Sequence, residues 1–147
     1  MFESAELGHQ IPKNVYKKEV PGLREDLLEM QYDLAESKKF SVVILIAGVD
    51  GAGKGETVNL LNEWMDPRQI STCAFGLPTA EESARPPMWR FWRALPPKGE
   101  IGILFGSWYT DPIVQKCYGE IKNADLDNAL EQIVRFEKML TDEGTLV

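Results

Sequence analysis

Residues 40–57 read FSVVILIAGVDGAGKGET, and this stretch decides the fold. Its first part, residues 40–47, is apolar, uncharged and rich in β-branched side chains, which is typical of a strand buried on both faces of a parallel sheet. A glycine-rich loop follows, and apolar side chains then recur at helical spacing at Val58, Leu60, Leu61, Trp64 and Met65. The order of strand, glycine loop and helix predicts a phosphate-binding loop.

The loop fits the consensus Gly-x-x-x-x-Gly-Lys from Gly48 to Lys54. Glycines let the backbone curl close to a ligand, and successive N–H groups at a helix N-terminus then form a nest for anions. We therefore expect phosphate to contact Lys54 and its neighbours Gly48, Gly51, Ala52, Gly53, Gly55 and Glu56. The alternatives are a glycine-rich turn that only links strand to helix, and a Glu56 that only complements the helix dipole.

Two positions set this loop apart from the usual consensus. Gly55 stands where Ser or Thr normally places a hydroxyl on Mg²⁺, and Thr57 lies two residues too late to replace it. Asp50 lies inside the loop, where most nucleotide hydrolases have no acid. Asp50 is a candidate to hold Mg²⁺ or to orient an acceptor, and its alternative role is to stabilise the turn.

The composition limits the classes of function. A chain of 147 residues with net charge −7 predicts one acidic domain, so any polyanion site must be a local positive pocket, and a general nucleic-acid-binding surface is not expected. Cys73 and Cys117 belong to no metal-ligand cluster, and we expect both to be reduced and buried in a cytoplasmic protein. His9, the single histidine, lies in a predicted mobile arm over residues 1–12, which argues against His-based nucleophilic catalysis. No signal peptide or membrane-spanning run is predicted.

The rest of the chain alternates helices with strands. We predict strands over residues 70–77, 101–105 and 145–147. Helices are predicted over residues 13–38, with a break or restart at Pro21, over residues 88–95, and over residues 125–142 before Gly144. Two further helices are predicted to start at N-caps, one at Thr79 and one at Asp111. The apolar face of the last helix is predicted at Leu126, Leu130, Ile133, Val134, Phe136 and Leu140. This alternation predicts a doubly wound parallel sheet. The chain stops as its last strand begins, so we expect residues 13–147 to form a partial, apparently truncated domain.

Taken together, these motifs resemble the polyphosphate kinase 2 family over about residues 20–147. The family loop reads Gly-x-Asp-x-x-Gly-Lys-Gly, which accounts for both oddities of the loop. The further matches are Trp89-Arg90, Leu95-Pro96, Gly99-Glu100-Ile101, Ser107-Trp108-Tyr109 and the helix end Phe136-Glu137-Lys138-Met139-Leu140.

The resemblance implies a fold and a chemistry. The fold is a three-layer α/β sandwich with a parallel sheet, similar to P-loop nucleoside triphosphate hydrolases and to thymidylate kinase. The chemistry is phosphoryl transfer between inorganic polyphosphate and AMP, ADP or another nucleotide, with Mg²⁺ as the cofactor. Neither a nucleic acid nor a membrane is an expected partner, whereas a homo-oligomer or a second copy of the domain remains open.

The sequence departs from the family pattern in two places. The family's third strand ends Phe-Asp-Arg, where the Asp holds Mg²⁺, but here Phe105 replaces the Asp and Gly106 replaces the Arg. The family's basic lid follows the fourth strand, where this chain ends. Both departures resemble the N-terminal half of fused two-domain members. We therefore expect a degenerate or incomplete phosphotransferase domain. The alternative is a non-catalytic module that binds polyphosphate or nucleotide and supports a partner domain; an ordinary ATP-dependent small-molecule kinase is less well supported.

By the same resemblance, the candidate catalytic residues are Asp50, Lys54 and Arg90, with Arg93 as a further phosphate contact. For both arginines the alternative is a solvated helix face whose alkyl stems cover Trp89 or Trp92. Trp108 and Tyr109 are expected in the core, and Lys98 is expected to be solvated.

Overall fold

The computed structural model describes residue 8 and residues 10–147, so most of the predicted mobile arm lies outside the described residues. Four parallel strands form one sheet in the order β2-β3-β1-β4. Their bounds are β1 Ser41–Ile46, β2 Ile70–Ala74, β3 Ile101–Phe105 and β4 Thr145–Leu146. This arrangement confirms the predicted parallel sheet, with β2 ending three residues earlier than expected.

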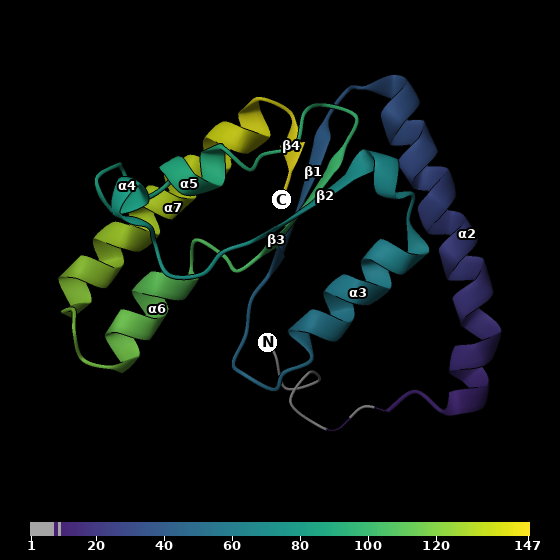
Figure 1. Cartoon of the computed structure of the whole chain (residues 1–147), viewed down its shortest axis with the longest axis horizontal. Coiled ribbons are helices and arrows are strands. Elements are labelled where there is room, and N and C mark those ends of the chain that lie inside the picture. The colour runs from purple at the N-terminus through teal and green to yellow at the C-terminus, as the bar shows by residue number, and fades with distance from the viewer. Residues whose placement is uncertain (1–7, 9) are drawn as a thin grey trace.

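Helices cover both faces of the sheet (Figure 1). One face carries α2 (Lys13–Ser37) and α3 (Lys54–Trp64), and the other carries α4 (Ala80–Ser83), α5 (Trp89–Trp92), α6 (Thr110–Cys117) and α7 (Asn123–Asp142). A short 3₁₀ helix, η1 (Pro67–Gln69), leads into β2. None of the helices in the described part of the chain combines the length and the apolarity of a membrane span.

The strands β1, β2 and β3 end level with one another. Phe105 at the end of β3 pairs with Ile46 of β1 on one side and with Ala74 of β2 on the other. Because the strands are parallel, the loops that follow them emerge at the same edge of the sheet. The phosphate loop and the segment after β3 are therefore neighbours.

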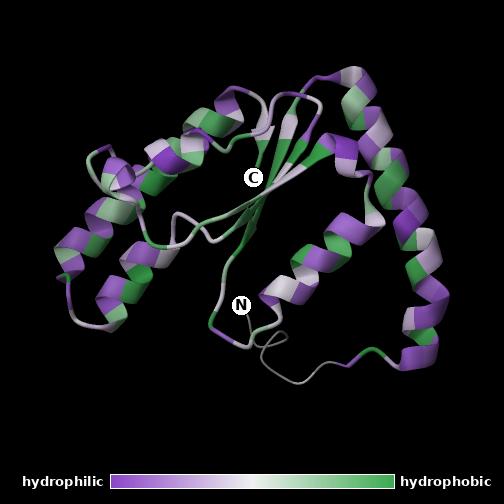
Figure 2. Cartoon of the chain, viewed as in Figure 1, coloured by the Kyte–Doolittle hydropathy of each residue, from purple (hydrophilic) through white to green (hydrophobic). Residues whose placement is uncertain are grey.

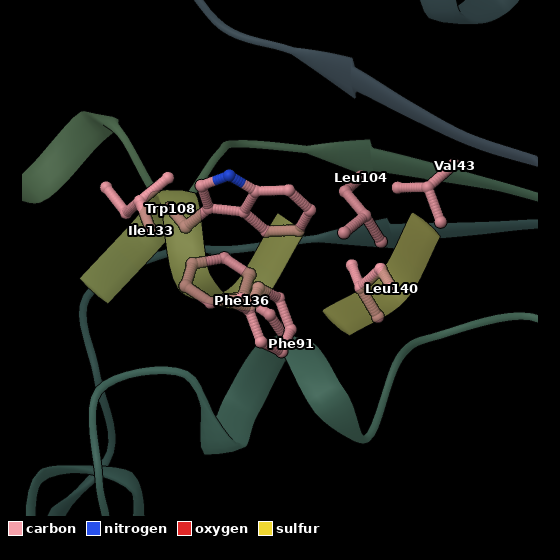
Figure 3. Close-up of a cluster of buried hydrophobic side chains, with 7 residues drawn as sticks. All are labelled: Val43, Phe91, Leu104, Trp108, Ile133, Phe136 and Leu140. Atoms are coloured by element: carbon pink, nitrogen blue, oxygen red, sulfur yellow. The ribbon is translucent and has the colours of Figure 1, made fainter. Parts of the chain in front are cut away.

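The core lies in two layers, one on each face of the sheet, and the apolar strands run through the middle of the molecule (Figure 2). On the α7 side of the sheet, Trp108 packs edge-on against Phe136 with 5.2 Å between ring centroids, and Phe91 packs edge-on against Trp108 (Figure 3). On the α2 side, Leu34, Met65 and Ile101 form the smaller cluster. Burying one such large side chain contributes about 1.5–3 kcal/mol, so both helical layers are firmly held.

A polar contact also joins α2 to the segment before β2. The Gln31 side chain donates to the Asp66 carbonyl at 2.9 Å and accepts from the Asp66 N–H at 2.7 Å. Hydrogen bonds from the Arg68 guanidinium, followed by the backbone N–H of Arg68, lower the pKa of the Asp66 carboxyl to about 2. This contact satisfies polar groups at a turn that hydrophobic packing alone would leave unpaired.

Several local predictions were wrong. The helix α2 runs through Pro21 without a break, because a single exposed proline removes only one backbone donor and the following turns are packed through Gln31 and Leu34. Asp111 is no cap, since α6 already begins at Thr110. Two side chains that were predicted to be buried are exposed, Val134 and Cys117. The helix predicted over residues 88–95 is the single turn of α5.

Candidate functional site

The loop between β1 and α3 is curled as its glycines predict. Gly51 and Gly53 both have φ near +81°, a backbone conformation that favours glycine. The Thr57 N–H donates to the Gly53 carbonyl as the first bond of α3. The N–H groups in the first turn of a helix have no acceptor within the helix. The backbone amides of Lys54, Gly55 and Glu56 are therefore free to donate to another partner. Their contact with phosphate stays a prediction.

The Lys54 ammonium lies back over its own loop. Its Nζ donates to the carbonyls of Gly48 at 2.6 Å and Val49 at 2.8 Å, and it lies 3.7 Å from the Asp50 carboxylate. The Asp50 side chain is fully exposed, whereas that of Lys54 is 21% exposed. The loop therefore holds its cation in place, and Lys54 is one of the residues that line a cavity at the loop.

This cavity, of about 670 Å³, opens between the loop and the ends of the strands. Among the residues that the structure describes, Asp50 and Lys54 are the only charged ones that line it. Its other walls come from the ends of β1, β2 and β3 and from α6: Ile46, Ala47, Gly48, Val49, Ala74, Phe75, Gly76, Phe105, Gly106, Thr110, Val114 and Tyr118. The site is thus one cation and a row of backbone amides against a largely apolar wall.

The end of β3 forms that wall. Phe105 lines the cavity and pairs with Ile46 at the end of β1, two residues before the loop begins at Gly48. That Phe105 stands in place of the family's acid stays a prediction. Gly106 follows with φ +109°, and a Cβ there would lie 3.2 Å from the Cβ of Phe75. Phe75 therefore occupies the space that a side chain at position 106 needs, and the wall is closed by packing.

Arg90 is neither a solvated helix side chain nor part of the cavity wall. Its Nη2 donates to the Gly76 carbonyl at 2.9 Å, its Nε lies 3.5 Å from the Glu82 carboxylate, and its guanidinium stacks 5.1 Å from the Phe75 ring. The side chain is only 9% exposed. The predicted solvated alternative is therefore wrong for Arg90, which instead supports the Phe75–Gly76 segment from behind.

The predicted cap at Thr79 is confirmed and contributes to this support. Thr79 and Glu82 form a reciprocal capping box at the start of α4. The hydrogen bond from the Thr79 backbone N–H lowers the pKa of the Glu82 carboxyl, and the nearby charge of Arg90 is a smaller cause in the same direction. Glu82 thus stays charged and keeps its ion pair with Arg90.

Arg93 lies away from the loop. Its guanidinium stacks 4.9 Å from the centre of the Trp89 ring, and the guanidinium of Arg85 lies 5.4 Å from the same ring. Arg93 lines a groove along β2 together with Arg90. This groove shares Ala74, Phe75 and Gly76 with the loop cavity, but neither arginine lines the cavity itself. Its position agrees with the predicted packing against Trp89.

Trp108 and Tyr109 are structural, as predicted. Both donate to Oε1 of Glu137, from the indole N–H at 2.9 Å and from the phenol at 2.7 Å. Burial, followed by the hydrogen bond from the phenol to Glu137 and the charge of Glu137, raises the pKa of Tyr109 to about 12. Sequence reasoning missed this anchor, although Glu137 shares a helical face with Ile133 and Phe136 and could have been found by that spacing.

The residues at the cavity do not fit a Mg²⁺ site built by the protein alone. Within residues 10–147, Asp50 supplies the only carboxylate at the cavity, and it lies 3.7 Å from the Lys54 ammonium. Gly55 has no hydroxyl, the Thr57 hydroxyl donates to a backbone carbonyl, and Phe105 has no ligand atom. Across the described residues, no group of three or more His, Cys, Asp or Glu side chains is placed to hold a metal. Mg²⁺ sites usually combine carboxylates, phosphates and water in an octahedron.

The chain has close relatives among known proteins. Over its full length it is 57% identical to a polyphosphate:AMP phosphotransferase of Pseudomonas aeruginosa and 53% identical to one of Pseudomonas syringae pv. tomato. It spans only 30% of the length of each of these relatives. An AMP/ADP-polyphosphate phosphotransferase of Meiothermus ruber is 31% identical over 84% of this chain and 45% of its own length.

Two crystal structures have the same fold. A polyphosphate kinase 2 from Pseudomonas aeruginosa PA01 superposes with a TM-score of 0.92 at 57% identity, covering 99% of this chain and 31% of that one. A polyphosphate kinase 2 from Arthrobacter aurescens TC1 superposes with a TM-score of 0.87 at 28% identity, and the match covers 95% of this chain and 50% of that one. The family model for polyphosphate kinase 2 matches residues 10–147. With this match over nearly all of its length, the chain belongs to the polyphosphate kinase 2 family.

Proposed function

We propose that this chain is a P-loop kinase-like domain of a polyphosphate-dependent nucleotide phosphotransferase, and that it binds phosphate but transfers little on its own. Membership of the family and the names of the Pseudomonas relatives support polyphosphate and AMP or ADP as the substrates. The curled loop and Lys54 support the binding of a phosphate chain. Arg90 acts here as a positioning residue for the cavity wall.

One observation carries the claim of low activity. Phe105 lies in the cavity wall where the resemblance expects the acid that holds Mg²⁺, and Phe75 fills the space beside Gly106. Phosphoryl transfer depends on positioning and on neutralising charge at the transferred group. A site with one lysine and no well-placed metal ligand among the described residues can position the phosphate chain but neutralises little of its charge.

The test is ADP formation from AMP and polyphosphate by this chain, with polyphosphate binding measured on the same preparation. We expect clear binding and negligible turnover. Robust Mg²⁺-dependent turnover would show that the domain is catalytically complete and that Asp50 or another acid holds the metal. Absence of polyphosphate binding would refute the phosphate site itself.

The alternative function is a binding or scaffold module within a longer protein. The apolar wall at Phe105 favours it, because this wall serves binding but not metal chemistry. The two functions separate in a longer parent protein that carries Lys54→Ala. A large fall in its kcat supports a direct role in transfer, whereas a rise in KM for polyphosphate at constant kcat supports the binding module.

A further inference from the structure

We infer that this site binds the phosphate chain in its metal-free form, and that Mg²⁺ weakens this binding. The inference rests on the proposed function, because it concerns the ionic form of the ligand at the same loop. It reverses the usual relation in phosphoryl-transfer sites, where metal ions bridge the phosphates and neutralise their charge.

The first step is the charge of the binding groups. Lys54 and the first-turn amides of α3 attract the phosphate chain through its negative charge. Mg²⁺ bound to the chain reduces that charge, and cations on a polyanion must be released before a protein cation takes their place. A site gains from the metal only if it supplies ligands that repay this loss.

The second step is the absence of such ligands at the cavity. The side of the cavity next to β3 presents Phe105, and behind it Phe75 packs against Gly106. Mg²⁺ keeps several of its waters when it binds phosphate. Among the described residues on this side of the cavity, Thr110 and Tyr118 carry hydroxyls but none carries a carboxylate, so a hydrated ion placed against the wall finds little to compensate for lost hydration. Asp50 offers the single carboxylate, on the exposed side of the loop.

The direct test titrates the unmodified chain with polyphosphate of defined length, once with a chelator and once with millimolar Mg²⁺ at matched ionic strength. We expect binding to be weaker in Mg²⁺ by about threefold or more. Equal or tighter binding in Mg²⁺ would overturn the inference while leaving the proposed function intact. No binding in either condition would refute the proposed function.

Gly55 offers a matched pair of variants that locates the cause. A Cβ at Gly55 meets no atom within 4 Å, and its φ is not positive, so a side chain fits there. Gly55→Ser restores the hydroxyl that the loop consensus places on Mg²⁺, and Gly55→Ala adds the same Cβ without it. We expect the Mg²⁺ penalty to shrink by about threefold in Gly55→Ser and to stay unchanged in Gly55→Ala. An identical Mg²⁺ response in both variants would overturn the assignment to missing ligands.

Discussion

The carboxyl ends of β1 and β3 lie side by side and level, yet they carry opposite chemistry. After β1, the chain curls through glycines and brings Lys54 and free amides to the cavity. After β3, Phe105 and Gly106 present an apolar wall that Phe75 closes. The strands are constrained by the core, and just past β3 the packing of Phe75 at Gly106 constrains the chain as well, whereas the loop past β1 leaves open space at Gly51, Gly53 and Gly55. A sheet can therefore be preserved while one of its functional edges changes.

The largest effect is expected from restoring an arginine at the end of β3. Gly106→Arg places a side chain at φ +109° and pushes a Cβ against Phe75, so we expect a loss of about 2–4 kcal/mol in the free energy of unfolding. Urea unfolding measures it. Gly55→Ala, at an open position on the β1 side, is the control and should change stability by less than about 1 kcal/mol. Equal stability of the two variants would mean that the β3 end is not closed by packing.

Lys54→Ala tests the β1 side. We expect the free energy of polyphosphate binding to weaken by about 1.5–3 kcal/mol, because a charge-assisted contact is removed, while the thermal midpoint stays unchanged. Lys98→Ala serves as the control, since Lys98 is an exposed lysine in the turn before β3, away from the loop. If both variants bind polyphosphate as the unmodified chain does, the loop is not the phosphate site.

A third prediction concerns how the segment after β3 is anchored. The pKa of Tyr109 is raised from 10.0 to about 12, so the folded state holds its proton more tightly than the unfolded state. Its contribution to stability is therefore complete below pH 10 and is lost as the pH rises towards 12. Denaturant unfolding over this interval should show a steeper fall for the unmodified chain than for Tyr109→Phe. Parallel curves would contradict the contact with Glu137.

The smallest effect is expected at Asp50. Its carboxylate lies 3.7 Å from Lys54 and is fully exposed, so Asp50→Asn removes a weak competitor of the anion. We expect polyphosphate to bind slightly more tightly, by a factor of less than about five, in a titration with a chelator present. A marked loss of affinity that appears only with Mg²⁺ would instead identify Asp50 as the metal ligand.

Much of the fold could be predicted because its signals are local. The buried strands, the loop glycines, the Thr79 cap and Gly144, with φ +85°, each follow from the conformations that those residue types prefer. At Pro21, packing of the later turns of α2 through Gln31 and Leu34 outweighed the local preference for a break, whereas at Asp111 the helix α6 begins one residue earlier, at Thr110. Val134 was predicted on the buried face but is exposed. Helical periodicity locates the apolar stripe of a helix, but it does not tell how much of the stripe's width the sheet covers.

By itself, the sequence determined the parallel α/β sheet and the position of the glycine loop between β1 and α3, since these depend on residue type and order along the chain. Only the tertiary structure decided what Arg90 and Glu137 do. Arg90 supports the segment next to the cavity, and Glu137 anchors Trp108 and Tyr109. The reason is physical: a charged side chain takes its role from the partners that satisfy its hydrogen bonds, and these partners come from distant parts of the chain.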